Sequence, residues 1–522
     1  MKKTILLFIN TAIVLAGMAQ GIYNTGAHIV SQSGSYLVLS QGNFTLTSQN
    51  DTYPASFANL KIEAGASLII EPKSFLTVSG TLTNSAGNGG LVISSGSEGT
   101  GSLIHSTPNV PATLNRYITG SAILTAMKLH FLSVPLTPPT ASFSALFSGS
   151  YLYDFDVANN SWNGLGTSTT AEMDETRGYM IYSPQVSHTF KFEGPMNAGT
   201  FSPLVTAEGE GNNLVPNPYP SAIDWDATGW TKTNIAASVY VWPSGGSNYA
   251  SYVGSTSNNG GSNIIPAGQA FIVRATATPT FIMTDAVRVH NSQSFFKANE
   301  TVTDLLRVKA TSNSMTDEAV VRFTEMATTN TDSDYDAWKL YGTDGAPQLY
   351  TLATDNEMLA INSLPTLNGY AKVPMNFEAN FAGNVTLSFS ELESFPGTLS
   401  IKLEDKLTGQ KINLRQQPSY TFAHLATNAK DRFILHFGSA TGIDEPQTTD
   451  GNIWIFEKSV NISSPASVGE KALVEIFNAA GQVVFSKQIT LSQPTQVPTN
   501  LSGFAVVRIS TDKNVWITKG IF

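Results

Sequence analysis

The stretch NLKIEAGASLIIEPKSFLTVSGTLTNSAGNGGLVISSGSEGTGSLI, from Asn59 to Ile104, decides the fold of the N-terminal part of the chain. Its apolar runs are short and evenly set: LKI, SLII, FLTV, TLTN, LVIS and SLI. Glycines fall in the gaps between these runs, at Gly65, Gly80, Gly87 and Gly96. The pattern is typical of stacked rungs, because each turn of chain can bury its apolar face only against the next turn. We therefore predict a small β-solenoid or roll within residues 20–115.

The remainder of the chain also has the pattern of β-strands. Runs such as GYMIY, AFIVR, AVVRF and RFILHF are rich in β-branched and aromatic residues, and clusters of turn residues separate them. A helical period of apolar residues is almost missing after the first 19 residues. The chain has 522 residues, which is too many for a single hydrophobic core. We therefore predict an all-β fold with β-sandwich domains over residues 116–297 and 298–438.

Residues 116–297 contain a weak internal duplication. Each half supplies a strand that ends in proline, an aromatic strand, a strand that follows a glycine, and an outer strand. In the first half these strands are residues 130–136, 151–156, 177–182 and 189–194. In the second half they are residues 213–220, 239–242, 266–273 and 280–285. We predict that the two halves close into one sandwich.

The segment NLVPNPYPSAIDW, from Asn213 to Trp225, is unusually rich in proline. Proline removes a backbone donor, so the chain must leave the sheet here and cross the end of the sandwich. We expect Tyr219 and Trp225 to cover the open end of the core and Asp224 to cap the following turn. The alternative is an acid–base pair formed by Asp224 and Asp226, although no group that would bind an electrophile accompanies it.

Charge and cysteine content exclude several functions. The chain has 29 Lys plus Arg against 39 Asp plus Glu, a net charge of −10, and only 13% charged residues. This balance argues against a nucleic-acid partner, which needs a basic face. The chain contains no cysteine, so a cysteine nucleophile, a thiolate metal site and a disulfide are all excluded.

The first residues resemble an export signal. MKK is basic, residues 5–16 are apolar, and the small residues Gly17 and Ala19 precede Gln20, so residues 1–19 are predicted to be a secretory signal peptide. No later segment approaches the roughly 18 to 20 apolar residues of a membrane-spanning helix. We therefore expect a protein that is secreted or located at the outer cell surface, with no transmembrane helix after signal cleavage.

Candidate metal and catalytic residues are few. Asp332, Asp334 and Asp336 have the alternate spacing of oxygen ligands, which makes them a weak candidate for a calcium loop. Ala337 and Thr343 stand where an EF-hand needs glycine and glutamate, so a solvated loop is the stronger interpretation. The seven histidines lack metal-ligand spacing, and no nucleophile elbow, zinc motif or phosphate loop is present. We predict no other cofactor and no enzymatic activity.

Aromatic residues cluster in the duplicated region and offer a binding hypothesis. Tyr219, Trp225, Trp242 and Tyr249 are candidate ligand-binding residues for an extracellular glycan or protein, because exposed rings beside Asn and Asp suit sugar rings. The favoured alternative is that these aromatics fill and cover the sandwich core.

Several motifs in the body of the chain occur together: NPYPSAIDW, IIPAGQAFIV, RVHN, DEAVVRF, YDAWKL and IKLEDKLTG. In this order they resemble a group of large, mostly uncharacterised surface proteins of the Bacteroidetes. The resemblance covers roughly residues 116–438. It implies no known reaction.

The C-terminal block is predicted to be a small β-sandwich over residues 451–522, after a polar linker at residues 439–450. ALVEIFNAAGQVV, then LSGFAVVRI, then Lys519 near the terminus resemble the type A sorting domain of the type IX secretion system. Gly481 and Gly503 match its hairpin and strand-entry glycines, whereas Phe504 stands where tyrosine is frequent. The resemblance implies two partners, the type IX secretion machinery and a sortase-like peptidase that removes the domain.

Together these features predict a secreted cell-surface protein with a structural, adhesive or ligand-binding task and no catalytic role. The alternative is a carbohydrate-binding protein, or an accessory protein of polysaccharide degradation. An enzyme acting on glycans would need a cleft with convergent carboxylates.

Overall fold

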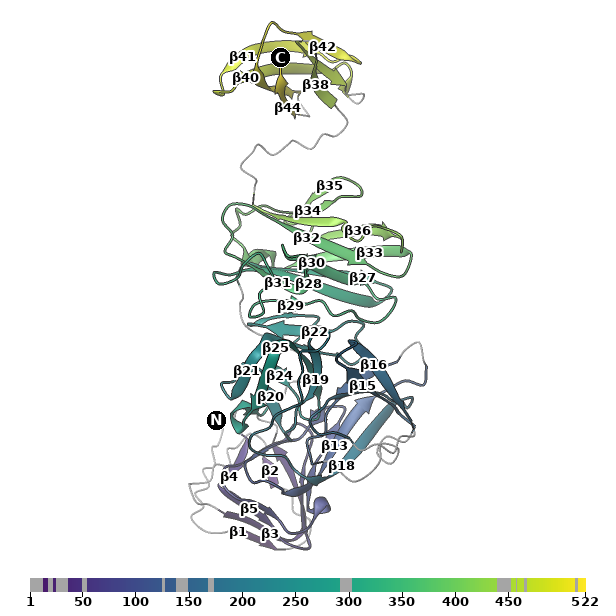
Figure 1. Cartoon of the computed structure of the whole chain (residues 1–522), viewed down its shortest axis with the longest axis vertical. Coiled ribbons are helices and arrows are strands. Elements are labelled where there is room, and N and C mark those ends of the chain that lie inside the picture. The colour runs from purple at the N-terminus through teal and green to yellow at the C-terminus, as the bar shows by residue number, and fades with distance from the viewer. Residues whose placement is uncertain are drawn as a thin grey trace. The chain divides into compact units, whose positions relative to one another are not determined.

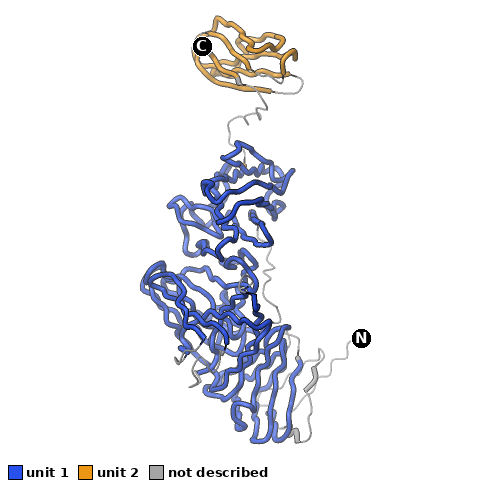
Figure 2. Tube along the Cα trace, turned by 90° about the vertical axis from the view of Figure 1, so that its right-hand side faces the viewer, with its two compact units in different colours: residues 1–437 blue, residues 438–522 orange. Residues whose placement is uncertain are grey.

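The computed structural model describes residues 13–16, 22–24, 36–48, 54–123, 127–137, 149–167, 173–291, 303–438, 452–456, 458–463, 467–511 and 515–522. Strands dominate this part of the chain, and its helical segments are short 3-10 turns: η1 (Asn88–Gly90), η3 (Asp285–Val287) and η4 (Leu392–Ser394). The predicted all-β fold class is therefore confirmed. A helix with the length and apolar character of a membrane span does not occur among these residues. The chain divides into two compact units, residues 1–437 and 438–522 (Figure 2).

Parallel strands at the start of the first unit form the predicted solenoid (Figure 1). Three columns of strands stack side by side, and partners within a column lie about 23 residues apart in sequence. Alternate residues point inward, as in the burial of Leu68 and Ile70. The columns are β3 (Tyr36–Ser48) with β5 (Asn59–Ile62) and β8 (Leu82–Asn84); β3 with β6 (Ala66–Ile70) and β9 (Leu91–Ile93); and β4 (Ala55–Phe57) with β7 (Phe75–Val78) and β12 (Ser102–His105).

Two further strands, β1 (Ile13–Ala16) and β2 (Ile22–Asn24), pair in parallel with β3. The strand β1 lies within the predicted signal peptide, whose other residues fall outside the described part of the chain. The signal peptide itself stays a prediction.

The strand β13 (Pro111–Thr119) joins the solenoid to the first half of the duplicated region. It pairs in parallel with β9 on one side and antiparallel with β18 (Ser187–Pro195) on the other. The predicted domain boundary between residues 115 and 116 therefore falls inside a strand and is wrong. One apolar cluster spans both sides of it, from Leu37 to Met196. Turn residues near Pro108 mark the entry to β13, not a division between cores.

The internal duplication is present in the strand order of two sheets. The first sheet runs β14–β17–β15–β16, and the second runs β19–β25–β21–β22–β23. In both, the strand that follows a glycine lies between the proline-ended strand and the aromatic strand. The bounds are β14 (Leu129–Leu132), β15 (Tyr151–Asp156), β16 (Ser161–Gly166), β17 (Tyr179–Tyr182), β19 (Asn212–Pro216), β21 (Trp230–Val241), β22 (Ala250–Val253), β23 (Thr256–Asn258) and β25 (Ala270–Met283).

The two sheets share apolar contacts, as predicted. Phe131 and Met180 of the first sheet belong to the same buried cluster as Leu214 and Ile272 of the second. The backbones approach closely at Gly178, where an added Cβ would lie 2.5 Å from the Cβ of Ala270. The outer strands differ between the halves: β18 pairs with β13, whereas residues 280–283 extend β25 along β21.

The third block of the first unit is one eleven-stranded sheet. Strands near its two ends pack against each other around a single core. The order is β35–β34–β37–β32–β30–β31–β28–β27–β33–β36, and β29 pairs with β31. Residues from both ends, such as Leu403 and Leu387, share one cluster, so the block is a sandwich as predicted. Its predicted start at residue 298 lies outside the described residues. The strands are β27 (Leu305–Ser312), β28 (Met315–Phe323), β29 (Ala337–Trp338), β30 (Gln348–Leu352), β31 (Met358–Leu364), β32 (Ala371–Glu378), β33 (Gly383–Ser390), β34 (Ile401–Asp405), β35 (Gln410–Asn413), β36 (Ser419–His424) and β37 (Phe433–Phe437).

The second unit is a small two-sheet sandwich with its own core. One sheet runs β38–β39–β42 and the other β41–β40–β43–β44, and buried residues such as Val460, Val474 and Trp516 form one cluster. The predicted linker, residues 439–450, lies outside the described residues. The strands are β38 (Asn452–Phe456), β39 (Ser459–Ser463), β40 (Lys471–Asn478), β41 (Val483–Thr490), β42 (Thr495–Pro498), β43 (Phe504–Ser510) and β44 (Val515–Ile521).

Candidate functional site

An arginine occupies an inward-facing position on β13. Along this strand Ala112, Leu114 and Ile118 are buried, and Arg116 has the same parity. Pairing with β9 ends at Leu114, so beyond that residue β13 lies against β18 without the next solenoid rung on its other side. The arginine therefore points into a space that the solenoid strands do not fill.

The side chain of Arg116 is buried. The residue is 6% exposed, and its Nε is enclosed without a hydrogen bond. No hydrogen bond or ion pair joins Arg116 to any other residue that the structure describes. Burial lowers the pKa of Arg116 to about 10, so the side chain is still positively charged at neutral pH.

Arg116 borders a cavity of about 180 Å³. The aromatic rings of Phe131 and Trp242 line it, and so do hydroxyl-bearing residues of the turn between β10 (Ser95–Gly96) and β11 (Gly99–Thr100). Gln269 also lines the cavity, and its Oε1 is buried without a hydrogen bond. Gly268, the residue before Gln269, lies against the stem of Arg116 and has φ of +71°, a backbone conformation that favours glycine.

Among the titratable residues that line the cavity, Arg116 is the one that is both buried and charged at neutral pH. Burial, together with the charge of Arg116, lowers the pKa of His130 to about 4, and its Nε2 lies 2.7 Å from the carbonyl oxygen of Thr119. His130 is therefore neutral at pH 7. Lys73 and Glu98 are more exposed and lie 3.5 Å apart. This arrangement can hold an anion, because it combines a fixed cation with polar groups that lack partners.

The proline-rich segment closes the core, as predicted. The amide of Asn217 is fully buried and donates to the carbonyl oxygens of Ser221 and Pro266. Tyr219 donates to Gly199 O at 2.6 Å, and Trp225 Nε1 donates to Ala237 O at 2.6 Å. The segment also reaches the solenoid, since Leu103 N donates to Pro220 O at 2.8 Å.

The predicted ligand-binding aromatics pack inside the protein. Tyr219 and Trp225 are 0% and 1% exposed, so neither ring can stack on a ligand, and their assignment as binding residues is wrong. Trp242 is 7% exposed and Tyr249 is half-buried, and their rings contact each other at 5.0 Å between centroids. Only Trp242 among these four borders the Arg116 cavity. Packing explains the other three.

Asp224 caps a turn, as predicted. Its Oδ1 accepts from Asp226 N and from Asn263 Nδ2, each at 2.9 Å. The hydroxyl of Tyr252 donates to Asp226 Oδ2. Both carboxylates therefore hold local structure, which removes the basis for an acid–base pair.

The three aspartates of the calcium candidate do not converge on a common site, and calcium binding stays a prediction. Asp336 is buried and accepts from Asp332 N at 2.7 Å and from Ser363 N at 2.6 Å. Asp332 accepts from Thr328 N and Oγ1, whereas Asp334 is exposed. The carboxylates thus bind backbone amides and a hydroxyl. The described part of the chain holds no group of three or more acidic or histidine side chains that could surround a metal ion.

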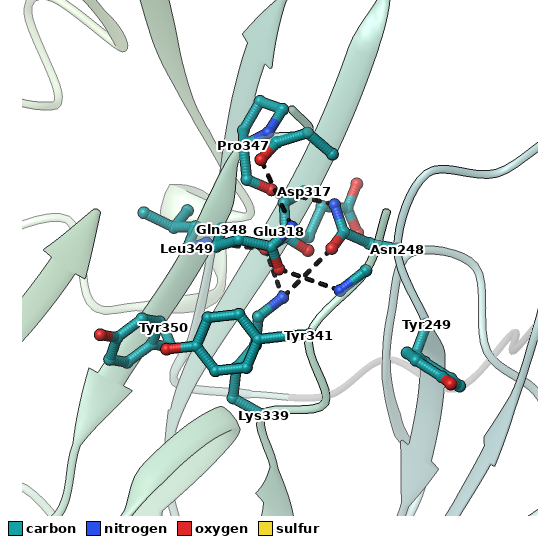
Figure 3. Close-up of polar contacts among 12 residues, drawn as sticks. Asn248, Tyr249, Asp317, Glu318, Lys339, Tyr341, Pro347, Gln348, Leu349 and Tyr350 are labelled. Carbon is teal, nitrogen blue, oxygen red and sulfur yellow. Dashed lines mark hydrogen bonds and ion pairs between the residues drawn. The ribbon is translucent and has the colours of Figure 1, made fainter. Parts of the chain in front are cut away.

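A second buried cation, Lys339, has a complete set of partners (Figure 3). Its Nζ lies 2.7 Å from Asp317 Oδ2 and 3.4 Å from Asn248 Oδ1. Asp317 also accepts from Leu349 N at 2.7 Å and from Asn259 Nδ2 at 2.9 Å. These bonds fasten the second half of the duplicated region to the third block, so the cluster is structural.

The predicted sorting residues lie at turns and strands of the second unit. Gly481, with φ of +77°, is in the turn between β40 and β41. Gly503, with φ of +93°, directly precedes β43 and exchanges hydrogen bonds with Phe522. Lys519 lies on β44. These positions fit hairpin and strand-entry glycines, and the sorting function stays a prediction.

Comparison with known proteins gives a family but no reaction. No curated protein matches the chain. A two-domain fibronectin type-III segment from chicken tenascin is similar at 14% identity, over 28% of this chain and 94% of that chain, with a TM-score of 0.12. Residues 29–437 match a family described as a domain of unknown function, DUF8693, and because the match covers more than half of the chain, the protein belongs to this family.

Proposed function

We propose that the protein is a secreted, non-catalytic ligand-binding protein of the outer cell surface, exported by the type IX secretion system. One observation carries the export part of the proposal. The family match ends at residue 437, and the first compact unit ends at the same residue. The second unit, residues 438–522, is therefore an appended module with a core of its own. An appended C-terminal sandwich that resembles a sorting domain supports export by this route.

The Arg116 cavity supports the ligand-binding part. A buried cation, two aromatic walls and an unpartnered amide oxygen make a recognition site for a polar molecule. In this proposal the first unit is the cargo that stays at the surface. The second unit contacts the secretion machinery and is removed by the sortase-like peptidase.

Deletion of residues 451–522 tests the export proposal in the native host. We expect the full-length protein to appear at the surface or in the medium, shortened by the mass of the second unit. The truncated protein should remain in the periplasm. Its melting temperature should match that of the full-length chain, because the first unit keeps all of its own cores.

A reciprocal fusion serves as the control. A periplasmic reporter that carries residues 439–522 should reach the surface, whereas the reporter alone should not. Efficient surface delivery of the truncated chain, or retention of the fusion in the periplasm, would contradict the sorting assignment.

A groove in the third block favours the alternative, a carbohydrate-binding protein. Its volume is about 420 Å³, and Tyr341, which is 43% exposed, forms part of its wall beside Glu378 and Asn380. Tyr341 donates to Glu378 Oε1 at 2.5 Å, and Lys430 lies 2.5 Å from Oε2, so the carboxylate is held in place. An exposed ring beside fixed polar groups suits a neutral sugar.

A glycan array tests this alternative. The mature protein should show selective spots that Tyr341→Ala removes, while Tyr36→Ala, at another exposed tyrosine, should change nothing. A blank array for the unmodified protein would dismiss the groove as a carbohydrate site.

A further inference from the structure

We propose that the cavity around Arg116 binds a small ligand that carries both a carboxylate and hydroxyl groups, namely an acidic sugar. The proposal deepens the ligand-binding part of the proposed function and rests on that part alone. It does not depend on the route of export.

The first support is a contrast among buried cations. In the described part of the chain these are Arg116, Arg288, Arg322, Lys339 and Arg432. Arg432 meets both oxygens of Asp405 at 2.7 and 2.9 Å, and Arg288 lies 2.9 Å from Asp285. Arg322 donates to hydroxyl and carbonyl oxygens. Arg116 alone among the five has no such oxygen, and a buried charge without a partner is strongly disfavoured. An anion that enters the cavity supplies the missing partner.

The shape of the guanidinium selects the kind of anion. Its N–H groups form a planar fork that matches the two oxygens of a carboxylate. No carboxylate of the described chain is within ion-pair distance of it. Glu98 is the acidic residue that lines the cavity, and its side chain is 77% exposed and lies near Lys73. A ligand carboxylate would therefore meet the two terminal nitrogens of Arg116, because Nε is enclosed.

Gln269 adds a second requirement. The residue lines the same cavity, and its Oε1 is an acceptor that is buried without a donor. A ligand that satisfies both residues must present a carboxylate to Arg116 and a hydroxyl or N–H donor to Gln269. Simple fatty acids and sulfate do not meet both conditions, because they carry no donor at neutral pH.

The residues that line the Arg116 cavity and the volume of the cavity narrow the class of ligand further. Phe131 and Trp242 offer apolar ring surface, and Ser95, Ser97 and Thr119 offer hydroxyl groups. A volume of about 180 Å³ is below the roughly 300 to 1,000 Å³ of drug-sized pockets. A single acidic sugar, either free or at the end of a glycan chain, fits these limits. Ser97 and Glu98 are exposed, so the cavity opens to solvent at the turn between β10 and β11.

Calorimetric titration of the full mature protein with sodium D-glucuronate tests the proposal. We expect saturable binding and a higher melting temperature with glucuronate, and neither effect with D-glucose. Arg116→Met keeps an unbranched apolar stem but removes the guanidinium and its charge. It should weaken glucuronate binding at least about tenfold, while the melting temperature of the ligand-free protein stays the same or rises.

Two further variants separate binding from folding. Ser97→Trp changes an exposed turn residue and should block the cavity mouth, so it should also weaken binding without lowering the melting temperature. Lys191→Met removes an exposed cation of β18 that does not line the cavity and should leave binding unchanged. A glucuronate-capped oligosaccharide that binds as tightly as the monosaccharide supports a glycan terminus as the source, and weaker binding supports the free acid.

Several results would overturn the proposal. Unchanged glucuronate binding in Arg116→Met and Ser97→Trp would place the ligand elsewhere. A lower melting temperature of ligand-free Arg116→Met would show that the arginine stabilises the fold. Binding of acetate or sulfate as tight as that of glucuronate would exclude an acidic sugar as the preferred ligand. A separate failure of surface delivery would affect only the export proposal.

Discussion

Lys339 and Arg116 are both buried cations, but they differ in whether other residues of the protein supply hydrogen-bond partners for them. Lys339 has a carboxylate at 2.7 Å, and that carboxylate also accepts from a backbone amide and an asparagine. Arg116 has aromatic walls, a neutral histidine and an amide oxygen that lacks a donor. The Lys339 cluster has its hydrogen-bond partners as soon as the chain folds. The second becomes complete only when something else enters, and this difference separates a structural ion pair from a binding site.

The largest effect is expected at Lys339. Lys339→Met leaves Asp317 buried without its cation and should lower the free energy of unfolding by about 3 to 5 kcal/mol. Arg116→Met should leave the free energy of unfolding unchanged or raise it. Urea denaturation of the two variants, followed by tryptophan fluorescence, measures both signs. If both variants lost stability equally, Arg116 would be a structural cation like Lys339, which would contradict its assignment to a binding site.

Acid should act on the cavity through His130. Its folded-state pKa of about 4 is below the usual value near 6.5, so the unfolded chain binds more protons between these values. Stability is therefore lost as the pH falls from about 6.5 to 4, by up to about 3 kcal/mol for this residue.

The His130→Gln variant isolates this contribution, because His105 is also buried and neutral. The variant should lose less stability than the unmodified protein over the same pH interval. Glucuronate should further reduce the loss in the unmodified protein, since a bound carboxylate raises the pKa of a neighbouring histidine. Identical pH profiles for the two proteins would show that protonation of His130 does not cause the loss of stability.

The smallest effect is expected at the rim. Lys73 is half-buried and pairs with the exposed Glu98, and Lys73→Met should change the free energy of unfolding by less than about 1 kcal/mol. Glucuronate binding should weaken a few-fold at low salt and hardly at all at physiological salt, because screening removes the attraction of an exposed charge. A large loss of binding at all salt concentrations would make Lys73 a direct contact and not a rim residue.

Local patterns were sufficient for much of the fold. The short runs between Asn59 and Ile104 predicted the parallel rungs, and the repeated order of strand types predicted two matching sheets. The boundary at residue 115 failed, because the turn signals near Pro108 do not reveal that β13 pairs with partners on both sides. The spacing of Asp332, Asp334 and Asp336 was misleading for a similar reason. The carboxylate of Asp336 accepts a hydrogen bond from the backbone amide of Ser363, which is distant in the sequence.

The candidate site shows the same limit. Arg116 follows Ala112 and Leu114 with the parity of a buried strand face, so its inward position was visible in the sequence. That it lacks a partner was not visible, because the surrounding residues come from several segments up to Gln269. Likewise, composition alone could not decide whether Tyr219 and Trp225 were exposed. Their burial follows from bonds to Gly199 and Ala237, which no local motif predicts.

The contacts at the end of the solenoid also bear on self-association. A stack of parallel rungs ends in a row of unpaired backbone groups, which can template the addition of further strands from other molecules. Here β13 and then β18 continue the sheet beyond β9, and Pro220 O accepts from the amide of Leu103 within β12. Proline at this position offers no amide of its own to continue the ladder. The proline-rich loop thus blocks the addition of a further strand at this edge of the solenoid and so opposes fibre growth.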